Sequence, residues 1–118
     1  MSVRRIVANI SAAEPAKARA FYEDLLGLKL AMDFGWILTF ASDELSAMPQ
    51  VSVMSEGGSG TPVPDLSIEV DDVDEVYAGA VAAGFEIVYP IVDEPWGVRR
   101  FFVVDPNGVV INVMSHRK

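Results

Sequence analysis

The sequence predicts an α+β fold built from two βαβββ modules, on the following observations. Each half of the 118-residue chain begins with an alternating strand, continues with an amphipathic helix and closes with three short apolar runs. The glycines that end the two predicted helices, Gly27 and Gly84, are 57 residues apart, which indicates an internal repeat. A glycine- and proline-rich stretch, EGGSGTPVP, separates the halves. We therefore expect a single domain over residues 1–118, with modules 1–57 and 62–118 and a linker at 56–63.

The first module starts with a strand over residues 3–11, whose apolar side consists of Ile6, Ala8 and Ile10. This side is expected to pack on the helix that follows, because a helix with one apolar stripe must bury it against a sheet. The helix is predicted within EPAKARAFYEDLLG, with Pro15 at its first position and Gly27 as its cap. Its stripe comprises Ala18, Phe21, Tyr22, Leu25 and Leu26. Strands follow at residues 28–32, 36–41 and 50–55.

The second module repeats this order from DLSIEV, a strand at residues 65–70. Asp72 and Glu75 have the spacing of a capping box at the start of the next helix, which ends at Gly84. The residues on the predicted buried face of this helix are Val73, Val76, Tyr77, Ala80 and Val81. The last strands are predicted at residues 85–92, 98–104 and 109–114, and the final two are joined by a DPNG turn that suits type I geometry.

Composition indicates a globular protein and excludes several classes of site. Hydrophobic residues make up 51% of the chain and the mean hydropathy is +0.29, which is enough apolar material for a core. No apolar run is long enough to cross a membrane and the N-terminus has no signal-like segment, so we expect a soluble, cytoplasmic protein without membrane contacts. A net charge of −8 argues against nucleic-acid partners. Cysteine is absent, and the single histidine, His116, is expected to lie in a frayed C-terminus.

The side of the predicted strands that faces away from the helices carries a mixture of polar and apolar side chains. This mixture is too polar for an interior and too apolar for free surface, and it suits the lining of a ligand-binding cleft. The residues on this side are Val7, Asn9, Ser11, Gln50, Ser52, Met54, Asp65, Ser67, Glu69, Val110, Asn112 and Met114.

Three segments resemble the glyoxalase, bleomycin-resistance and extradiol dioxygenase group, also called vicinal oxygen chelate proteins. They are AKARAFYEDLLGL at 16–28, IEVDDVDEV at 68–76 and WGVRRFFVVDPNGVVINVM at 96–114. The resemblance implies that the two modules form a curved, eight-stranded mixed sheet. It also implies an open cup that holds the site, and commonly a homodimer.

Catalytic members of this group hold a divalent metal with His and Glu or Gln side chains from four strands. Carried over one at a time, these positions fall here on Val7, Asp65 and Asn112, with the fourth at either Gln50 or Ser52. A hydrocarbon cannot coordinate a metal and a neutral amide is a poor ligand for a transition metal, whereas catalytic sites need about three protein ligands. We therefore expect no metal, no other cofactor and no catalytic residue of the metal-dependent kind.

The resulting prediction is a metal-independent, antibiotic-like small-molecule binder of the bleomycin-resistance type. One alternative is a metal-dependent lyase, isomerase or dioxygenase of the same superfamily with an atypical ligand set. Another is an interaction module with an empty cup. The predicted ligand-binding residues are Asn9, Trp36, Gln50, Ser52, Asp65, Ser67, Glu69, Trp96, Arg99, Asn112 and Met114.

The two tryptophans and one arginine are predicted to form aromatic walls and a basic fork for a planar or anionic ligand. The alternative is that Trp36 and Trp96 pack on a dimer partner. Arg99 and Arg100 must face opposite sides of a strand, and the family pattern favours Arg99 for the cup. Carboxylates at Asp65 and Glu69 are able to hold a cationic ligand, or Glu69 pairs instead with Arg5 or Arg99.

Overall fold

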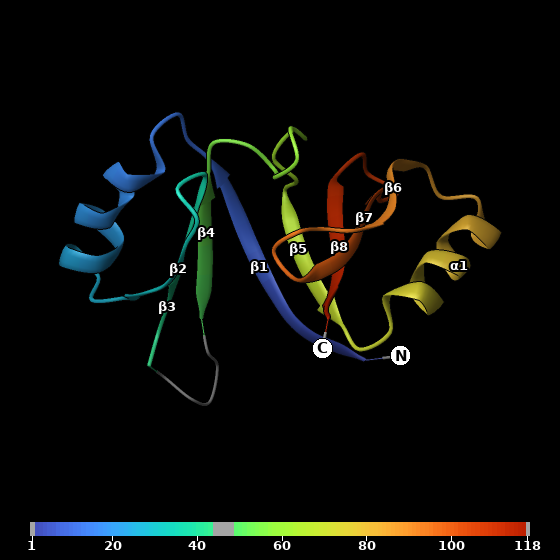
Figure 1. Ribbon diagram of the computed structural model, residues 1–118, viewed down its shortest axis with the longest axis horizontal. Coiled ribbons are helices and arrows are strands. Elements are labelled where there is room, and N and C mark those ends of the chain that lie inside the picture. Colours follow the sequence, from blue (N-terminus) through green and yellow to red (C-terminus); the bar gives the residue numbers. More distant parts are fainter. Residues whose placement is uncertain (1, 44–48, 118) are drawn as a thin grey trace. The chain divides into compact units, whose positions relative to one another are not determined.

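The computed structural model describes residues 2–43 and 49–117. Residues 1, 44–48 and 118, which the predicted modules include, lie outside this part. The strands form one mixed sheet in the order β2-β3-β4-β1-β5-β8-β7-β6 (Figure 1), which confirms the predicted fold class. The chain divides into two compact units, an N-terminal unit of residues 7–63 and a C-terminal unit of residues 1–6 and 64–118. The long first strand therefore contributes its beginning to the C-terminal unit and its end to the N-terminal unit.

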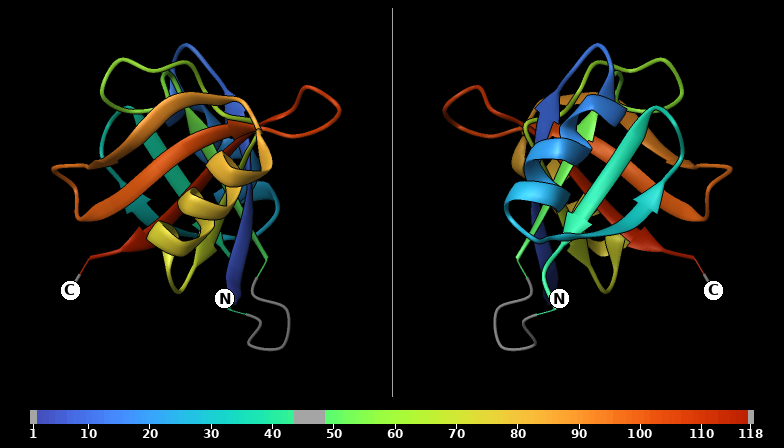
Figure 2. Two further views of the ribbon diagram at one scale, coloured as in Figure 1. Left: turned by 90° about the vertical axis from the view of Figure 1, so that its right-hand side faces the viewer. Right: turned by 90° about the vertical axis from the view of Figure 1, so that its left-hand side faces the viewer.

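The N-terminal unit combines four strands with two short helical segments. Strand β1 runs parallel to β4, and β3 runs antiparallel to both β4 and β2. The elements are β1 (Val3–Ser11), η1 (Pro15–Ala18), η2 (Ala20–Leu25), β2 (Lys29–Asp33), β3 (Ile37–Ala41) and β4 (Gln50–Met54). The helical segments lie over one face of these strands (Figure 2, right).

The predicted first helix is a 3-10 turn followed by a π-helix, and its buried stripe is narrower than predicted. Leu26 N–H donates to the Phe21 carbonyl five residues back, at 3.1 Å, which shifts the side-chain period away from 3.6 residues per turn. Ala18 and Tyr22 pack on the core of Leu38, Phe40 and Val53, as predicted. By contrast, the side chains predicted to share their stripe are exposed, by 52% for Phe21, 68% for Leu25 and 55% for Leu26.

The prediction for the two sides of β1 is wrong. Ile6 is 60% exposed and Ile10 is 39% exposed, whereas Val7, on the other side, is buried. None of Ile6, Ala8 and Ile10 contributes to the core beneath the helical segments. Alternation shows which residues share a side of a strand, but the neighbouring elements decide which side is covered.

The segment predicted as a linker folds into a hydrogen-bonded turn. Gly57 N–H donates to the Thr61 carbonyl at 2.8 Å, and the Thr61 hydroxyl donates to the Gly58 carbonyl at 2.8 Å. Gly57 and Gly58 are both buried. A methyl group on Gly57 would lie 2.3 Å from the Pro62 carbonyl oxygen, so the absence of a side chain is a packing requirement at this position.

The C-terminal unit has the elements that the sequence predicts, with one long helix on its sheet. Strand β5 runs parallel to β8, and β7 runs antiparallel to both β8 and β6. Asp72 Oδ1 accepts from Glu75 N–H at 3.1 Å and Gly84 adopts φ 79°, so both predicted ends of the helix are confirmed. The elements are β5 (Leu66–Val70), α1 (Val73–Ala83), β6 (Ile87–Asp93), β7 (Val98–Val104) and β8 (Val110–His116).

Helix α1 covers one face of this sheet (Figure 2, left) and buries a core around Phe101. The rings of Tyr77 and Phe101 meet edge to face, with centroids 4.9 Å apart. Val81, predicted on the buried face, is exposed instead. No helix in the described residues has the length and apolar character that a membrane crossing requires.

Candidate functional site

The face of the C-terminal sheet opposite α1 carries a compact set of polar and aromatic side chains. Strand register places Asn112 beside Ser67 on β5 and beside Phe102 on β7. One row further along, Met114 lies between Glu69 and Arg100. Four predicted site residues, Ser67, Glu69, Asn112 and Met114, therefore lie together on this face.

Asn112 holds a buried hydrogen-bond acceptor beside a hydroxyl group. Its Nδ2 donates to Ser67 Oγ at 3.0 Å, and the residue is only 8% exposed. Its Oδ1 is buried and accepts no hydrogen bond from any described residue. A buried carbonyl oxygen without a donor costs about 1–3 kcal/mol, so such an atom needs a specific reason to persist.

Asp65 uses its carboxylate to fix the start of β8. Val110 N–H donates to Asp65 Oδ2 at 3.0 Å, and Asp65 N–H donates to the Val110 carbonyl at 2.9 Å. The side chain thus supports the pairing of β5 with β8 at the edge of the polar face. This backbone role competes with metal coordination by the same oxygen.

Glu69 contacts one guanidinium group and one imidazole ring. Its Oε1 lies 2.7 Å from Arg5 Nε and its Oε2 lies 3.0 Å from His116 Nδ1. Burial raises the pKa of the Glu69 carboxyl, but the hydrogen bond with His116 and the charge of Arg5 outweigh it, so the pKa lies below its ordinary value. The alternative that Glu69 pairs with Arg5 is confirmed. The prediction of a frayed His116 is wrong, because this residue ends β8 and contacts Glu69.

The choice of Arg99 over Arg100 for this face is wrong. Arg99 lies on the helix side of β7, where its Nη2 is 2.9 Å from Asp74 on α1 and its Nη1 is 3.1 Å from Asp93. These two carboxylates raise the pKa of Arg99. Phe101 and Val103, which pack under α1, share this side of the strand. The sequence carries no signal that separates the two arginines, because Val98 and Phe102 on the Arg100 side are as apolar as Phe101 and Val103.

Arg100 is enclosed by aromatic rings and a carboxylate. Its Nε donates to Glu94 Oε2 at 2.7 Å, and the Tyr89 hydroxyl donates to the same oxygen at 3.0 Å. The guanidinium carbon lies 4.7–5.2 Å from the ring centroids of Tyr89, Trp96 and Phe102. Sequence pattern does not single out Glu94, Tyr89 or Phe102. It predicts that Trp96 contacts a ligand, whereas its ring lies against the Arg100 guanidinium.

The N-terminal unit carries the other predicted site residues. Asn9, Ser52 and Thr39 lie in one row across β1, β4 and β3. The hydroxyl oxygens of Thr39 and Ser52 are 2.7 Å apart and both residues are buried. Gln50 lies opposite Ala41, and the Trp36 ring is 6.4 Å from the Phe34 ring, between centroids.

The side chains present do not fit a catalytic divalent metal. Within residues 2–43 and 49–117, no three His, Cys, Asp or Glu side chains come together in an arrangement that could hold a metal ion. The matching family positions hold a buried valine at Val7, an amide at Asn112 and, at Asp65, a carboxylate that accepts from a backbone N–H. Hard or borderline cations need several charged or imidazole donors, and this set does not supply them.

The sequence matches the model of a known protein family over most of its length. A family model described as Glyoxalase/Bleomycin resistance protein/Dioxygenase superfamily matches residues 5–113. No curated protein matches the sequence significantly.

Several solved structures share the fold at low sequence identity. A structure described as an NAD-dependent benzaldehyde dehydrogenase from Legionella pneumophila has a TM-score of 0.77 and 18% identity, and the match covers 96% of this chain and 100% of that one. Methylmalonyl-CoA epimerase from Mycobacterium tuberculosis has a TM-score of 0.65 and 17% identity, over 98% and 88% of the two chains. A glyoxalase/bleomycin resistance protein/dioxygenase superfamily member from Vibrio splendidus has a TM-score of 0.62 and 15% identity, over 98% and 99%. At these identities the likeness concerns the fold alone.

Proposed function

Because the chain belongs to the Glyoxalase/Bleomycin resistance protein/Dioxygenase superfamily, we propose that it is a metal-independent small-molecule-binding protein of the bleomycin-resistance type. The observation that carries this proposal is the buried Oδ1 of Asn112, which accepts no hydrogen bond from the described chain. A ligand N–H or O–H group directed at this oxygen would remove the cost of leaving it unsatisfied.

The surroundings of Asn112 define the chemistry of the proposed ligand. The Ser67 hydroxyl lies beside the Asn112 amide, and Phe102 and Met114, both buried, are the apolar neighbours on the adjoining positions of the sheet. Binding sites commonly combine a few placed polar groups with aromatic and apolar walls. The proposed ligand therefore has a hydrogen-bond donor on a planar or apolar body.

Charge on this face is compensated within the protein. Arg5 and His116 contact Glu69, and Glu94 contacts Arg100. A ligand does not need to bring a strong charge of its own, since neither ion pair leaves an unbalanced group. This compensation weakens the prediction that Glu69 holds a cationic ligand, and it favours neutral donors.

Dimer formation and cytoplasmic location are further parts of the proposal. The exposed side chains of Phe21 and Leu25 on η2, and of Leu26 directly after it, provide apolar surface that a second copy would bury. Light scattering coupled to size-exclusion chromatography measures the mass directly. A monomer at all concentrations would contradict the dimer and leave the ligand proposal intact.

Native mass spectrometry of protein purified without added metal, before and after chelator treatment, tests the proposal. We expect spectra without a bound divalent ion that chelator leaves unchanged, and any copurified small molecule would identify the ligand class. A stoichiometric divalent ion that is lost on chelation would overturn the proposal and support the alternative of a metal-dependent enzyme. That enzyme would have to use donors such as Gln50 and Asp65.

Variants at two asparagines locate the binding. Asn112→Leu removes the buried acceptor at similar size and is expected to abolish retention of a copurified ligand. Asn107→Leu, in the exposed turn before β8, is the matched control and is expected to retain it. Equal retention by both variants would show that the ligand does not use Asn112.

A further inference from the structure

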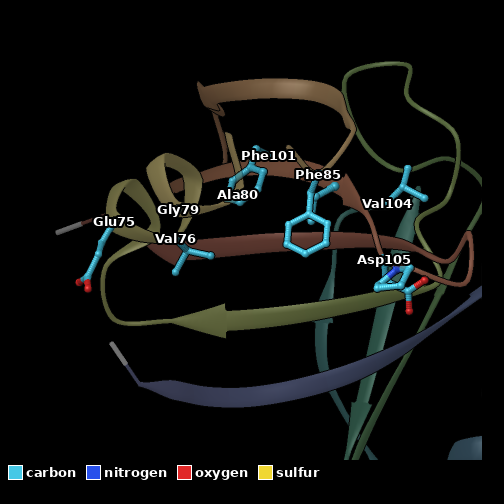
Figure 3. A pocket seen from close by; sticks show the side chains of 10 residues that line it. Glu75, Val76, Gly79, Ala80, Phe85, Phe101, Val104 and Asp105 are labelled. Carbon is cyan, nitrogen blue, oxygen red and sulfur yellow. The ribbon is translucent and has the colours of Figure 1, made fainter. Parts of the chain in front are cut away.

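A cavity lies between α1 and β7, on the side of the C-terminal sheet opposite the polar face. Its volume is about 460 Å³, which is within the range of small-molecule sites. It is lined by Glu75, Val76, Gly79 and Ala80 from α1, by Phe101, Val103 and Val104 from β7, and by Phe85, Asp105 and Pro106 from the adjoining loops (Figure 3). None of these residues belongs to the polar face around Asn112, so this cavity is independent of the proposed function.

Small side chains on α1 leave this space open. Gly79 lines the cavity, and a methyl group built on it would have no atom within 4 Å. Ala80 is its neighbour on the helix, and Phe85, just beyond the helix, is 46% exposed. The cavity opens to solvent, and the exposed phenylalanine at its side supplies apolar surface that a ligand would bury.

The charge around the cavity has one sign. Among the described residues, the charged groups that line it are the carboxylates of Glu75 and Asp105, which Figure 3 shows toward its two ends. Asp105 Oδ1 accepts from the N–H groups of Asn107 and Val109 at 2.8 and 2.9 Å, which holds the carboxylate in place. Arg99, on the same face of the sheet, is bound to Asp74 and Asp93 and does not line the cavity.

We propose that this cavity binds a small amphiphilic cation, that is, a protonated or quaternary amine on a hydrocarbon or aromatic body. The body would bury against Val76, Phe85 and Phe101, because transfer of apolar surface from water is favourable. The cationic group would lie at either carboxylate end, and the Phe85 ring adds a cation–π partner. An anion of the same shape would meet only negative charge, in a chain whose net charge is already −8.

Three probes with one common body test the charge preference. Phenylbutylamine, phenylbutanol and phenylbutyrate are titrated into isotope-labelled protein while amide chemical shifts are followed. The amine is expected to bind about threefold more tightly than the alcohol, because an exposed charge contact contributes only a small free energy. The acid is expected to bind more weakly than the alcohol. Shift changes are expected at residues 75–85 and 101–106.

Two variants test separately whether the ligand needs the open space at Gly79 and whether it needs the Glu75 carboxylate. Gly79→Leu fills the cavity and is expected to weaken amine binding by at least about tenfold, because a filled cavity leaves no apolar surface to bury. Ala78→Leu is the matched control, since it adds the same side chain at an exposed position of α1 that does not line the cavity, and it is expected to bind normally. Glu75→Gln, which keeps the backbone bond to Asp72, is expected to reduce the preference for the amine over the alcohol, and the preference that remains measures the contribution of Asp105.

The proposal is overturned by any of three results. One is the absence of saturable shifts with the amine up to its solubility. Another is equal binding of amine and acid, and the third is a shift pattern centred on Ser67 and Asn112. If Gly79→Leu does not fold, as judged by its circular dichroism and melting temperature, the Glu75→Gln comparison still decides the charge preference.

Discussion

Arg100 and Glu94 form an ion pair that is almost fully buried, with Nε 2.7 Å from Oε2 and with side chains 3% and 4% exposed. The preceding residue, Arg99, is an arginine with the opposite placement, on the helix side and paired with exposed carboxylates. Two adjacent arginines on one strand thus form one buried ion pair and one solvent-accessible set of ion pairs. This arrangement gives a matched comparison within the same strand.

Arg100→Met is expected to lower the free energy of unfolding by roughly 3–5 kcal/mol, because it leaves the Glu94 carboxylate buried without its cation. Arg99→Met is the control, and it should cost only about 0–1 kcal/mol, since water screens an exposed pair. Urea denaturation followed by circular dichroism measures both values. The double variant Arg100→Met with Glu94→Leu should recover much of the loss. Equal effects of the two single arginine variants would show that burial does not govern these pairs.

The buried hydroxyls of Thr39 and Ser52, 2.7 Å apart, provide a second test. Thr39→Val keeps the shape of the side chain and leaves Ser52 without this partner, so we expect a loss of about 1–3 kcal/mol in unfolding free energy. Replacing both residues, as Thr39→Val with Ser52→Ala, should restore part of this loss, because neither hydroxyl of the pair is then left buried without a partner. A double variant that is less stable than the sum of the single changes would contradict this account. Chemical denaturation of the wild type, Thr39→Val, Ser52→Ala and the double variant gives the complete double-mutant cycle.

Glu69 is expected to make stability depend on pH in the acid range. Its pKa in the folded protein lies below the ordinary value of 4.5, so its contribution is fully present above that pH. The contribution is lost as pH falls through the folded-state pKa, because the unfolded chain then binds the proton more readily. Melting temperatures of the wild type and Glu69→Gln should therefore differ most at neutral pH and converge as the pH falls below 4.5 and through the folded-state pKa. A difference that grows on acidification would have the wrong sign.

Gly57→Ala is expected to destabilise the N-terminal unit by about 1–3 kcal/mol, because the added methyl group would meet backbone and side-chain oxygens of the turn. Its Cβ would lie 2.3 Å from both Pro62 O and Thr61 Oγ1. Gly79→Ala is the control for the same chemical change in open space, and it should be neutral or stabilising by up to about 1 kcal/mol. Thermal unfolding distinguishes the two. If Gly57→Ala were as stable as Gly79→Ala, the turn at residues 57–61 would be looser than its hydrogen bonds indicate.

Short-range sequence patterns were sufficient to predict where the strands and helix α1 lie. The strands and α1 could be predicted because alternation, capping at Asp72 and a left-handed Gly84 are properties of short stretches of chain. The fold class followed from their order and from the repeat. The site was predicted less well, although Ser67, Glu69, Asn112 and Met114 do share one face.

The sequence by itself determined which residues share a side of β1, β5 and β8, and where α1 begins and ends. Only the tertiary structure decided which side is covered, as Ile6 and Val7 on β1 and the two arginines on β7 demonstrate. It also decided the pairing of Glu69 with Arg5 and His116, which are distant along the chain. The physical reason is that burial and charge pairing are set by the elements that pack against a residue. A periodic pattern describes a residue's own segment and carries no information about those neighbours.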